Sequence, residues 1–172
     1  MINLSIKEIN GCTLWHHSKN IITKFDNRKY QQYITTKPSG IWFSFKCSNG
    51  EDTWENYCKI HNFMVHNLAN KVQIELNIPI TETLLYVTSP YDVFKLEEEY
   101  GEKINLSSPS IIHIDWEKVS QDYCGIVLYE ESPNCLKSLG YGKEYLNKIN
   151  NWLDTWSVYS GCIWNANYVN II

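Results

Sequence analysis

The sequence lacks several features that would each assign it to a familiar class of protein. No stretch approaches the ~18 consecutive apolar residues of a membrane-spanning helix, and residues 1–20 contain no basic segment followed by an apolar run. Cys-x-x-Cys pairs, Gly-x-Ser-x-Gly and His-Glu-x-x-His motifs and glycine-rich phosphate loops are also absent. We therefore expect a cytoplasmic protein without a membrane span and without the common zinc, hydrolase or nucleotide-loop signatures.

An excess of positive charge is missing as well. The net charge is −4 and the isoelectric point is about 5.7, so nonspecific attraction to a nucleic-acid backbone is not expected. The cysteines are even in number but scattered, without the dense spacing of small secreted scaffolds. We expect free thiols in a reducing compartment at the six positions Cys12, Cys47, Cys58, Cys124, Cys135 and Cys162.

Aromatic residues are abundant. The 172 residues, enough for one domain spanning 1–172, include seven Trp, twelve Tyr and five Phe, or 14% of the chain. A core of this size does not need so many rings, so some are expected to line a groove or an interface. Trp152 and Trp156 are spaced to share a helix face, where core packing is the favoured reading and a target-binding platform the alternative.

The order of the expected elements favours an α+β fold with a split, mainly antiparallel sheet and short flanking helices, because strands alternate irregularly with helices. Helical or loosely helical spacing of apolar residues is found over 21–33, 51–68, 92–100, 116–121 and 144–156. Alternating or β-branched runs predict strands over 13–16, 41–46, 71–76, 83–89, 110–115, 125–129, 161–164 and 168–172.

Two short segments carry most of the functional signal: Leu14-Trp15-His16-His17-Ser18 and Gly40-Ile41-Trp42-Phe43-Ser44. An imidazole at the end of a strand and a nearby hydroxyl, His16 and Ser18, are able to hold a polyhydroxylated ligand. Gly40 allows the backbone to approach closely, and Trp42 offers a flat apolar wall. The alternative is that His16 is a satisfied buried polar group and Trp42 a core residue.

Together the segments resemble the ADP-ribosyltransferase superfamily, in its diphtheria-toxin and poly(ADP-ribose) polymerase branch. That branch has Leu-Trp/Tyr-His-Gly-Ser/Thr at the end of its first strand. The resemblance implies that His16 bonds the hydroxyl of the ribose attached to nicotinamide and that Ser18 contacts the adenosine side of NAD. His17 departs from the pattern, because most members have Gly there, and either crowds the pocket or adds a polar contact.

The second segment resembles the branch's Gly-Ile/Leu-Tyr-Phe-Ser/Ala strand. By this resemblance Gly40 to Ser44 belong to the NAD site, with Gly40 and Ser44 at the two ends of the motif. Trp42 replaces the usual Tyr and would stack on nicotinamide. Trp54 stands where the family has a second ring, which implies that nicotinamide lies between Trp42 and Trp54.

A catalytic carboxylate is the part of the pattern that the sequence shows least plainly. Breaking the nicotinamide–ribose bond leaves a cation-like sugar, which nearby negative charge stabilises. In the family a Glu near a late strand supplies that charge. Glu130 is the first candidate here, Asp122 the second and Glu144 the third. Without such a group, transfer should be slow, or the chain only binds nucleotide.

The resemblance thus implies mono-ADP-ribosyl transfer from NAD, used as substrate, to an unidentified protein or nucleic-acid acceptor. A catalytically inactive binding module of the same fold is the alternative, and a Trp-rich docking domain is a third reading. The role remains open between toxin, defence factor and regulator, and the oligomeric state is not specified. No metal is expected, although Cys58, His61 and His66, with His113, form a metal-like set.

Overall fold

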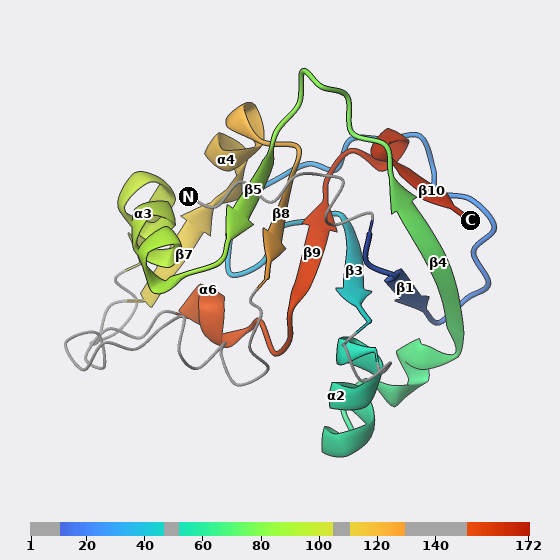
Figure 1. Cartoon of the computed structure of the whole chain (residues 1–172). Helices are drawn as coiled ribbons and strands as arrows, with labels where there is room; N and C mark the ends of the chain where they lie inside the picture. Colours follow the sequence, from blue (N-terminus) through green and yellow to red (C-terminus); the bar gives the residue numbers. More distant parts are fainter. Residues whose placement is uncertain (1–10, 47–51, 105–110, 130–150) are drawn as a thin grey trace.

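The computed structural model describes residues 11–46, 52–104, 111–129 and 151–172 and has an α+β architecture (Figure 1). The strands are β1 (Leu14–Ser18), β2 (Ile34–Thr35), β3 (Ile41–Phe45), β4 (Asn70–Leu76), β5 (Leu84–Val87), β6 (Gly101–Ile104), β7 (Ile111–Asp115), β8 (Gly125–Leu128), β9 (Ser160–Ile163) and β10 (Val169–Ile171). The helices are α2 (Thr53–His61), α3 (Pro90–Tyr100), α4 (Trp116–Asp122) and α6 (Asn151–Asp154), with 3₁₀ turns η1 (Val65–Leu68) and η2 (Ala166–Tyr168).

The strands form a seven-stranded sheet in the order β10-β4-β1-β3-β9-β8-β5 and a three-stranded sheet in the order β2-β7-β6. Only β5 and β8 pair in parallel within the described residues; the other pairs are antiparallel. The expected α+β class with a mainly antiparallel sheet is therefore confirmed.

Alternating side chains give the large sheet a buried cluster on each face. Along β8, Ile126 belongs to one cluster and Val127 to the other. The Ile126 cluster packs under α3, α4 and α6, which lie together at one side of the molecule in Figure 1. On the opposite side of the molecule, α2 and η1 lie beside the ends of β3, β1 and β4.

Two expected helices differ from the structure. Residues 21–33 form no helix, because their backbone bonds go elsewhere: Tyr30 donates to the Trp164 carbonyl, and Arg28 accepts from Ala166. The helix expected over 51–68 ends at His61. Asn62 adopts left-handed backbone angles there and its N–H caps the helix. The chain then continues through a second left-handed residue, Met64, into η1.

Three further expectations concern the chain as a whole. No helix in the described ranges is long and apolar enough to cross a membrane. Cys58, Cys124 and Cys162 are buried free thiols, as expected, while Cys47 and Cys135 lie outside the described residues. Of the helix expected over 144–156, the described part contains only α6.

Candidate functional site

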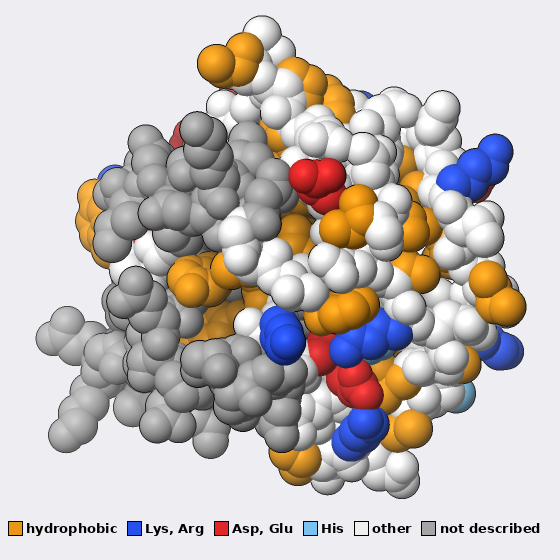
Figure 2. Space-filling model, turned by 45° about the vertical axis from the view of Figure 1, so that its right-hand side comes forward, with side chains coloured by type: hydrophobic (Ala, Val, Ile, Leu, Met, Phe, Trp, Pro, Cys, Tyr) orange, Lys and Arg blue, Asp and Glu red, His pale blue; other side chains and the backbone are white. Residues whose placement is uncertain are grey.

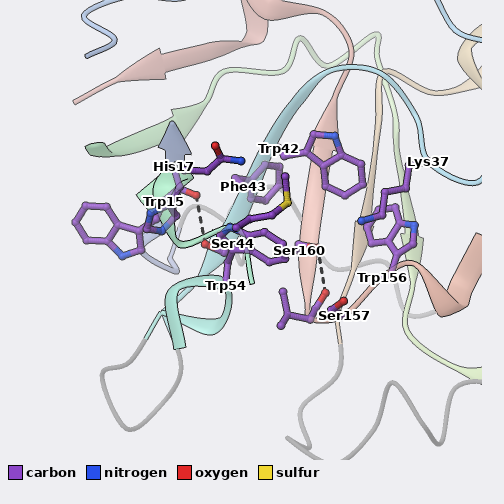
Figure 3. Close-up of a pocket in the computed structure, with 13 residues that line it drawn as sticks. Trp15, His17, Lys37, Trp42, Phe43, Ser44, Trp54, Trp156, Ser157 and Ser160 are labelled. Carbon is purple, nitrogen blue, oxygen red and sulfur yellow. Dashed lines mark hydrogen bonds between the residues drawn. The ribbon is translucent and has the colours of Figure 1, made fainter. Parts of the chain in front are cut away.

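Four tryptophans line one pocket at the α2 end of the large sheet (Figure 3). Its volume is about 260 Å³, near the lower limit of the ~300–1,000 Å³ typical of small-molecule sites. The space thus suits one ring and its immediate substituents better than a whole dinucleotide. The lining residues are Trp15, His17, Lys37, Trp42, Phe43, Ser44, Trp54, Met64, Asn67, Trp156, Ser157, Val158 and Ser160.

The indoles come from separate elements and contact different neighbours. Trp42, on β3, lies against Trp156 with ring centres 4.7 Å apart. Trp54, in the first turn of α2, stacks on Tyr57 at 5.9 Å. The structure thus brings together Trp42 and Trp54, the two rings predicted to hold nicotinamide, and Ser44 lines the same pocket.

The two adjacent histidines of β1 have different surroundings, because side chains alternate along a strand. Trp15 and His17 line the pocket, whereas His16 does not. The His16 ring packs edge-on against Phe25 at 5.2 Å, and its Nδ1–H donates to the Trp42 carbonyl at 2.7 Å. Burial lowers the pKa of His16 and outweighs this hydrogen bond. The predicted site imidazole is therefore behind the pocket wall, and His17 is the imidazole in the wall.

Asp52 connects the pocket wall to the start of α2. Its Oδ1 accepts from Ser44 Oγ at 2.8 Å and from the backbone N–H groups of Trp54 and Glu55, each at 3.0 Å. Its Oδ2 accepts from His17 Nε2 at 3.0 Å. As the N-cap of α2, Asp52 thereby fixes both the helix and the Trp54 ring that the helix carries.

Asp52 is anionic at neutral pH. Burial alone would raise the pKa of this carboxyl, but hydrogen bonds from His17, the Glu55 N–H and Ser44 lower the pKa to about 2. Because the carboxylate accepts from Nε2–H, His17 Nδ1 is left as the second ring nitrogen, buried and without a partner among the described residues. The His17 side chain is only 4% exposed.

His17, Asp52 and Glu55 are also the only described residues whose donor atoms group as metal ligands do, within 4.8 Å of one another. The ammonium of Lys71 already lies beside these carboxylates. Lys71 Nζ lies 3.2 Å from Asp52 Oδ2 and 2.8 Å from Glu55 Oε2. In the lower centre of Figure 2, basic side chains likewise flank acidic ones. The set Cys58, His61 and His66 is not among the groups brought together.

Several predicted site residues lie away from this pocket. Ser18 is at the end of β1, where its Oγ donates to the Asn20 carbonyl at 2.7 Å. Gly40 provides close approach, but to β9: a Cβ there would lie 2.5 Å from the Ile163 carbonyl oxygen. Asp122 ends α4, is exposed and accepts from Tyr100 at 2.8 Å.

The remaining carboxylate candidates, Glu130 and Glu144, lie outside the described residues. Within the described part of the pocket wall there is no Asp or Glu.

Sequence reasoning did not assign four residues that matter here: Trp15, Lys37, Asp52 and Trp156. Asp52 carried a usable signal, because an Asp directly before a helical pattern is a preferred N-cap. Trp15 was accessible through strand alternation with His17. Trp156 was interpreted as a core residue, with a target-binding platform as the alternative, and Lys37, in the connection before β3, was not considered.

Comparison with known proteins adds no relative. The chain matches no protein-family model, no curated protein and no solved structure.

Proposed function

We propose that this protein transfers a single ADP-ribosyl group from NAD to a macromolecular acceptor and releases nicotinamide. The observation that carries the proposal is the meeting of Trp42, from β3, and Trp54, from α2, in the wall of one ring-sized pocket. These are the positions that the resemblance assigns to the two rings of the nicotinamide site. Flat indole walls favour a planar heteroaromatic ligand.

In the proposed reaction, the bond between nicotinamide nitrogen and ribose C1′ breaks. The electron pair leaves with nicotinamide, an acceptor nucleophile bonds to C1′, and the acceptor loses a proton. The protein's contribution is to hold the ring and the ribose in the geometry of bond cleavage and to stabilise the developing positive charge.

His16 has a positioning role in this scheme. Its bond to the Trp42 carbonyl fixes the backbone that carries the stacking ring. The charge-stabilising group is Glu130, the leading candidate of the sequence. β8 ends opposite Ser160, a pocket-lining residue, through the pair Leu128 and Ser160, and Glu130 follows two positions later in the sequence.

A noncatalytic binding module is the second candidate, and one observation favours it: no carboxylate belongs to the described part of the pocket wall. Such a module would bind nicotinamide or NAD in the same pocket and release no nicotinamide.

The test combines a binding and a turnover measurement. Nicotinamide and NAD are titrated by calorimetry, and nicotinamide release from NAD is followed with cell lysate as the source of acceptors, together with incorporation of adenylate-labelled NAD. If the protein transfers ADP-ribose, ligand binding, nicotinamide release and incorporation of label should all be observed. Glu130→Gln should then lose release and incorporation but retain binding. Glu117→Gln, an exposed acid on α4, is the matched control. Binding without release supports the module, and absence of binding overturns both.

A further inference from the structure

Among the described residues, Lys37 is the only lysine or arginine that lines the aromatic pocket, and no acidic side chain lines it. Nor does any carboxylate of the described residues form an ion pair with Lys37. The contrast with Lys71 is direct, because Lys71 is paired with both Asp52 and Glu55. Lys37 therefore brings an uncompensated positive charge into a largely apolar wall.

The backbone around Lys37 is fixed by side-chain hydrogen bonds. Thr35 Oγ1 donates to the Lys37 carbonyl at 2.6 Å. Gln32, which is buried, donates to the Ser39 carbonyl at 2.7 Å and accepts from the Ser39 N–H at 3.0 Å. The connection between β2 and β3 is thus held at Lys37 and at Ser39, so the backbone that carries the lysine side chain is fixed before any ligand binds.

The ammonium lies over the Trp42 ring, with Nζ 5.3 Å from the ring centre. The attraction between the cation and the aromatic face retains the charge beside the ring. Burial lowers the pKa of Lys37, as expected for an ammonium that lacks an acidic partner.

A second donor contacts the same ring. Trp156 is 3% exposed, and its indole packs 4.7 Å from that of Trp42. Its Nε1–H is buried and has no acceptor among the described residues. An indole N–H only donates, as does an ammonium. Lys37 and Trp156 are both drawn beside Trp42 in Figure 3, and each carries a group that requires an acceptor.

We propose that Lys37 is the anion-binding residue of this pocket and that its ligand is the phosphate ester of a heteroaromatic nucleoside. The inference rests on the proposed function, which supplies a pyridine nucleotide as that ligand. The aromatic base lies against the indoles, and the phosphate accepts from Lys37. This arrangement also explains how a chain with a net charge of −4 attracts an anion.

The experiment varies ligand and protein together. Nicotinamide, nicotinate, nicotinamide riboside and nicotinamide mononucleotide are titrated by calorimetry into the intact protein, Lys37→Met and Lys37→Arg. Lys95→Met is the matched control, because Lys95 is an exposed lysine on α3, paired with Glu98, and its loss changes the net charge equally. Thermal unfolding of each variant shows that the fold is retained.

The mononucleotide is expected to bind at least ~10-fold more tightly than the riboside, the usual effect of a charge-assisted hydrogen bond. Lys37→Met should remove this advantage without weakening riboside binding, because the riboside is a pyridinium cation and gains no attraction from the ammonium. Lys37→Arg should retain most of the advantage, and Lys95→Met all of it. Equal affinities for the two ligands, or an advantage that survives Lys37→Met, would overturn the proposal. So would a Lys37-dependent gain for nicotinate alone, since the anion would then be a ring carboxylate.

A second ligand pair separates this proposal from the proposed function. If no pyridine ligand binds, the NAD assignment fails, and adenosine and adenosine monophosphate are titrated in the same way. A Lys37-dependent preference for the monophosphate then supports the phosphate role of Lys37. Failure of this pair as well overturns both.

Discussion

Three tryptophans of the core differ from Trp156, at the pocket, in the hydrogen bonding of the indole N–H. Trp116, Trp152 and Trp164 are at most 1% exposed, and each indole N–H has an acceptor: the Thr35 carbonyl, Glu97 Oε1 and the Tyr123 carbonyl. Trp156 is just as firmly buried, yet its N–H has no partner among the described residues. The indole N–H is therefore hydrogen-bonded at these three core positions and has no partner among the described residues at Trp156.

This difference is the one expected between a region that stabilises the fold and a region that binds a ligand. Buried polar groups in folded proteins are almost always paired, because an unpaired one costs about 1–3 kcal/mol. Two buried atoms without a partner among the described residues, His17 Nδ1 and Trp156 Nε1, belong to pocket residues. Unpaired donors and acceptors around one pocket are expected where a ligand supplies the missing hydrogen bonds.

The largest effect should come from truncating a core ring. Trp116→Ala removes a fully buried indole and its hydrogen bond to Thr35, and is expected to lower the free energy of unfolding by about 3–5 kcal/mol. Trp54→Ala, at the half-buried pocket position, should lower it by about 1 kcal/mol. Urea denaturation measures both. Equal losses of unfolding free energy in the two variants would show that core and pocket tryptophans contribute equally to stability.

A smaller loss of stability, with a specific pH dependence, is expected for Asp52→Asn. Because Asn caps helices as well as Asp does, the substitution mainly removes the charge. The folded pKa of about 2 lies below the usual 3.8, so ionised Asp52 stabilises the fold above pH 3.8, and this is lost as the pH falls toward 2. The variant should lose about 2 kcal/mol at pH 7.

Urea titrations from pH 7 to 2 provide the measurement, and the variant's acid limb should be flatter. Asp115→Asn is the control for ligand affinity, because Asp115 is likewise a buried N-cap with a lowered pKa, at the start of α4 among the core rings. Nicotinamide affinity should fall in Asp52→Asn and persist in Asp115→Asn. A variant of Asp52 with an unchanged acid limb would contradict the assignment of this charge.

Local patterns in the sequence were sufficient for most of the fold. The strand expected over 71–76 and the helix over 92–100 agree with β4 and α3 within two residues, because alternation and helical spacing are local properties. The helix predicted over 21–33 was wrong, because the apolar residues of this segment do not face one core: Ile21 is 80% exposed. Its backbone bonds depend on the Trp164 region, which no local pattern encodes.

The candidate site was less accessible to sequence reasoning. Trp42, Ser44 and Trp54 were named and line one pocket. Choosing between His16 and His17, however, required knowing which face of β1 is directed toward the pocket, and that depends on how β1 pairs with β3 and β4. Lys37 and Trp156 meet Trp42 only through tertiary contacts.

Removing a pocket ring tests the binding half of the comparison. Trp54→Ala should weaken nicotinamide binding by about tenfold, equivalent to about 1.4 kcal/mol, because one face of the ligand loses its stacking partner. Trp54→Phe should retain most of the affinity. Trp152→Phe, on the core side, is the control and should leave affinity unchanged. Calorimetric titration with nicotinamide measures these affinities. If the affinity does not depend on the residue at position 54, Trp54 is not part of the binding site.

The smallest effect concerns His16. Its folded pKa lies below the ordinary 6.5 because burial disfavours the charged ring. The unfolded chain therefore takes up a proton first, and stability should decrease as the pH falls below 6.5. His16→Gln should lose this part of the slope between pH 7 and 5, whereas His66→Gln, at an exposed position, should keep it. The positive charge of the neighbouring His17 adds to the lowering of the His16 pKa. An unchanged slope in His16→Gln would contradict the assignment of this pH dependence to His16.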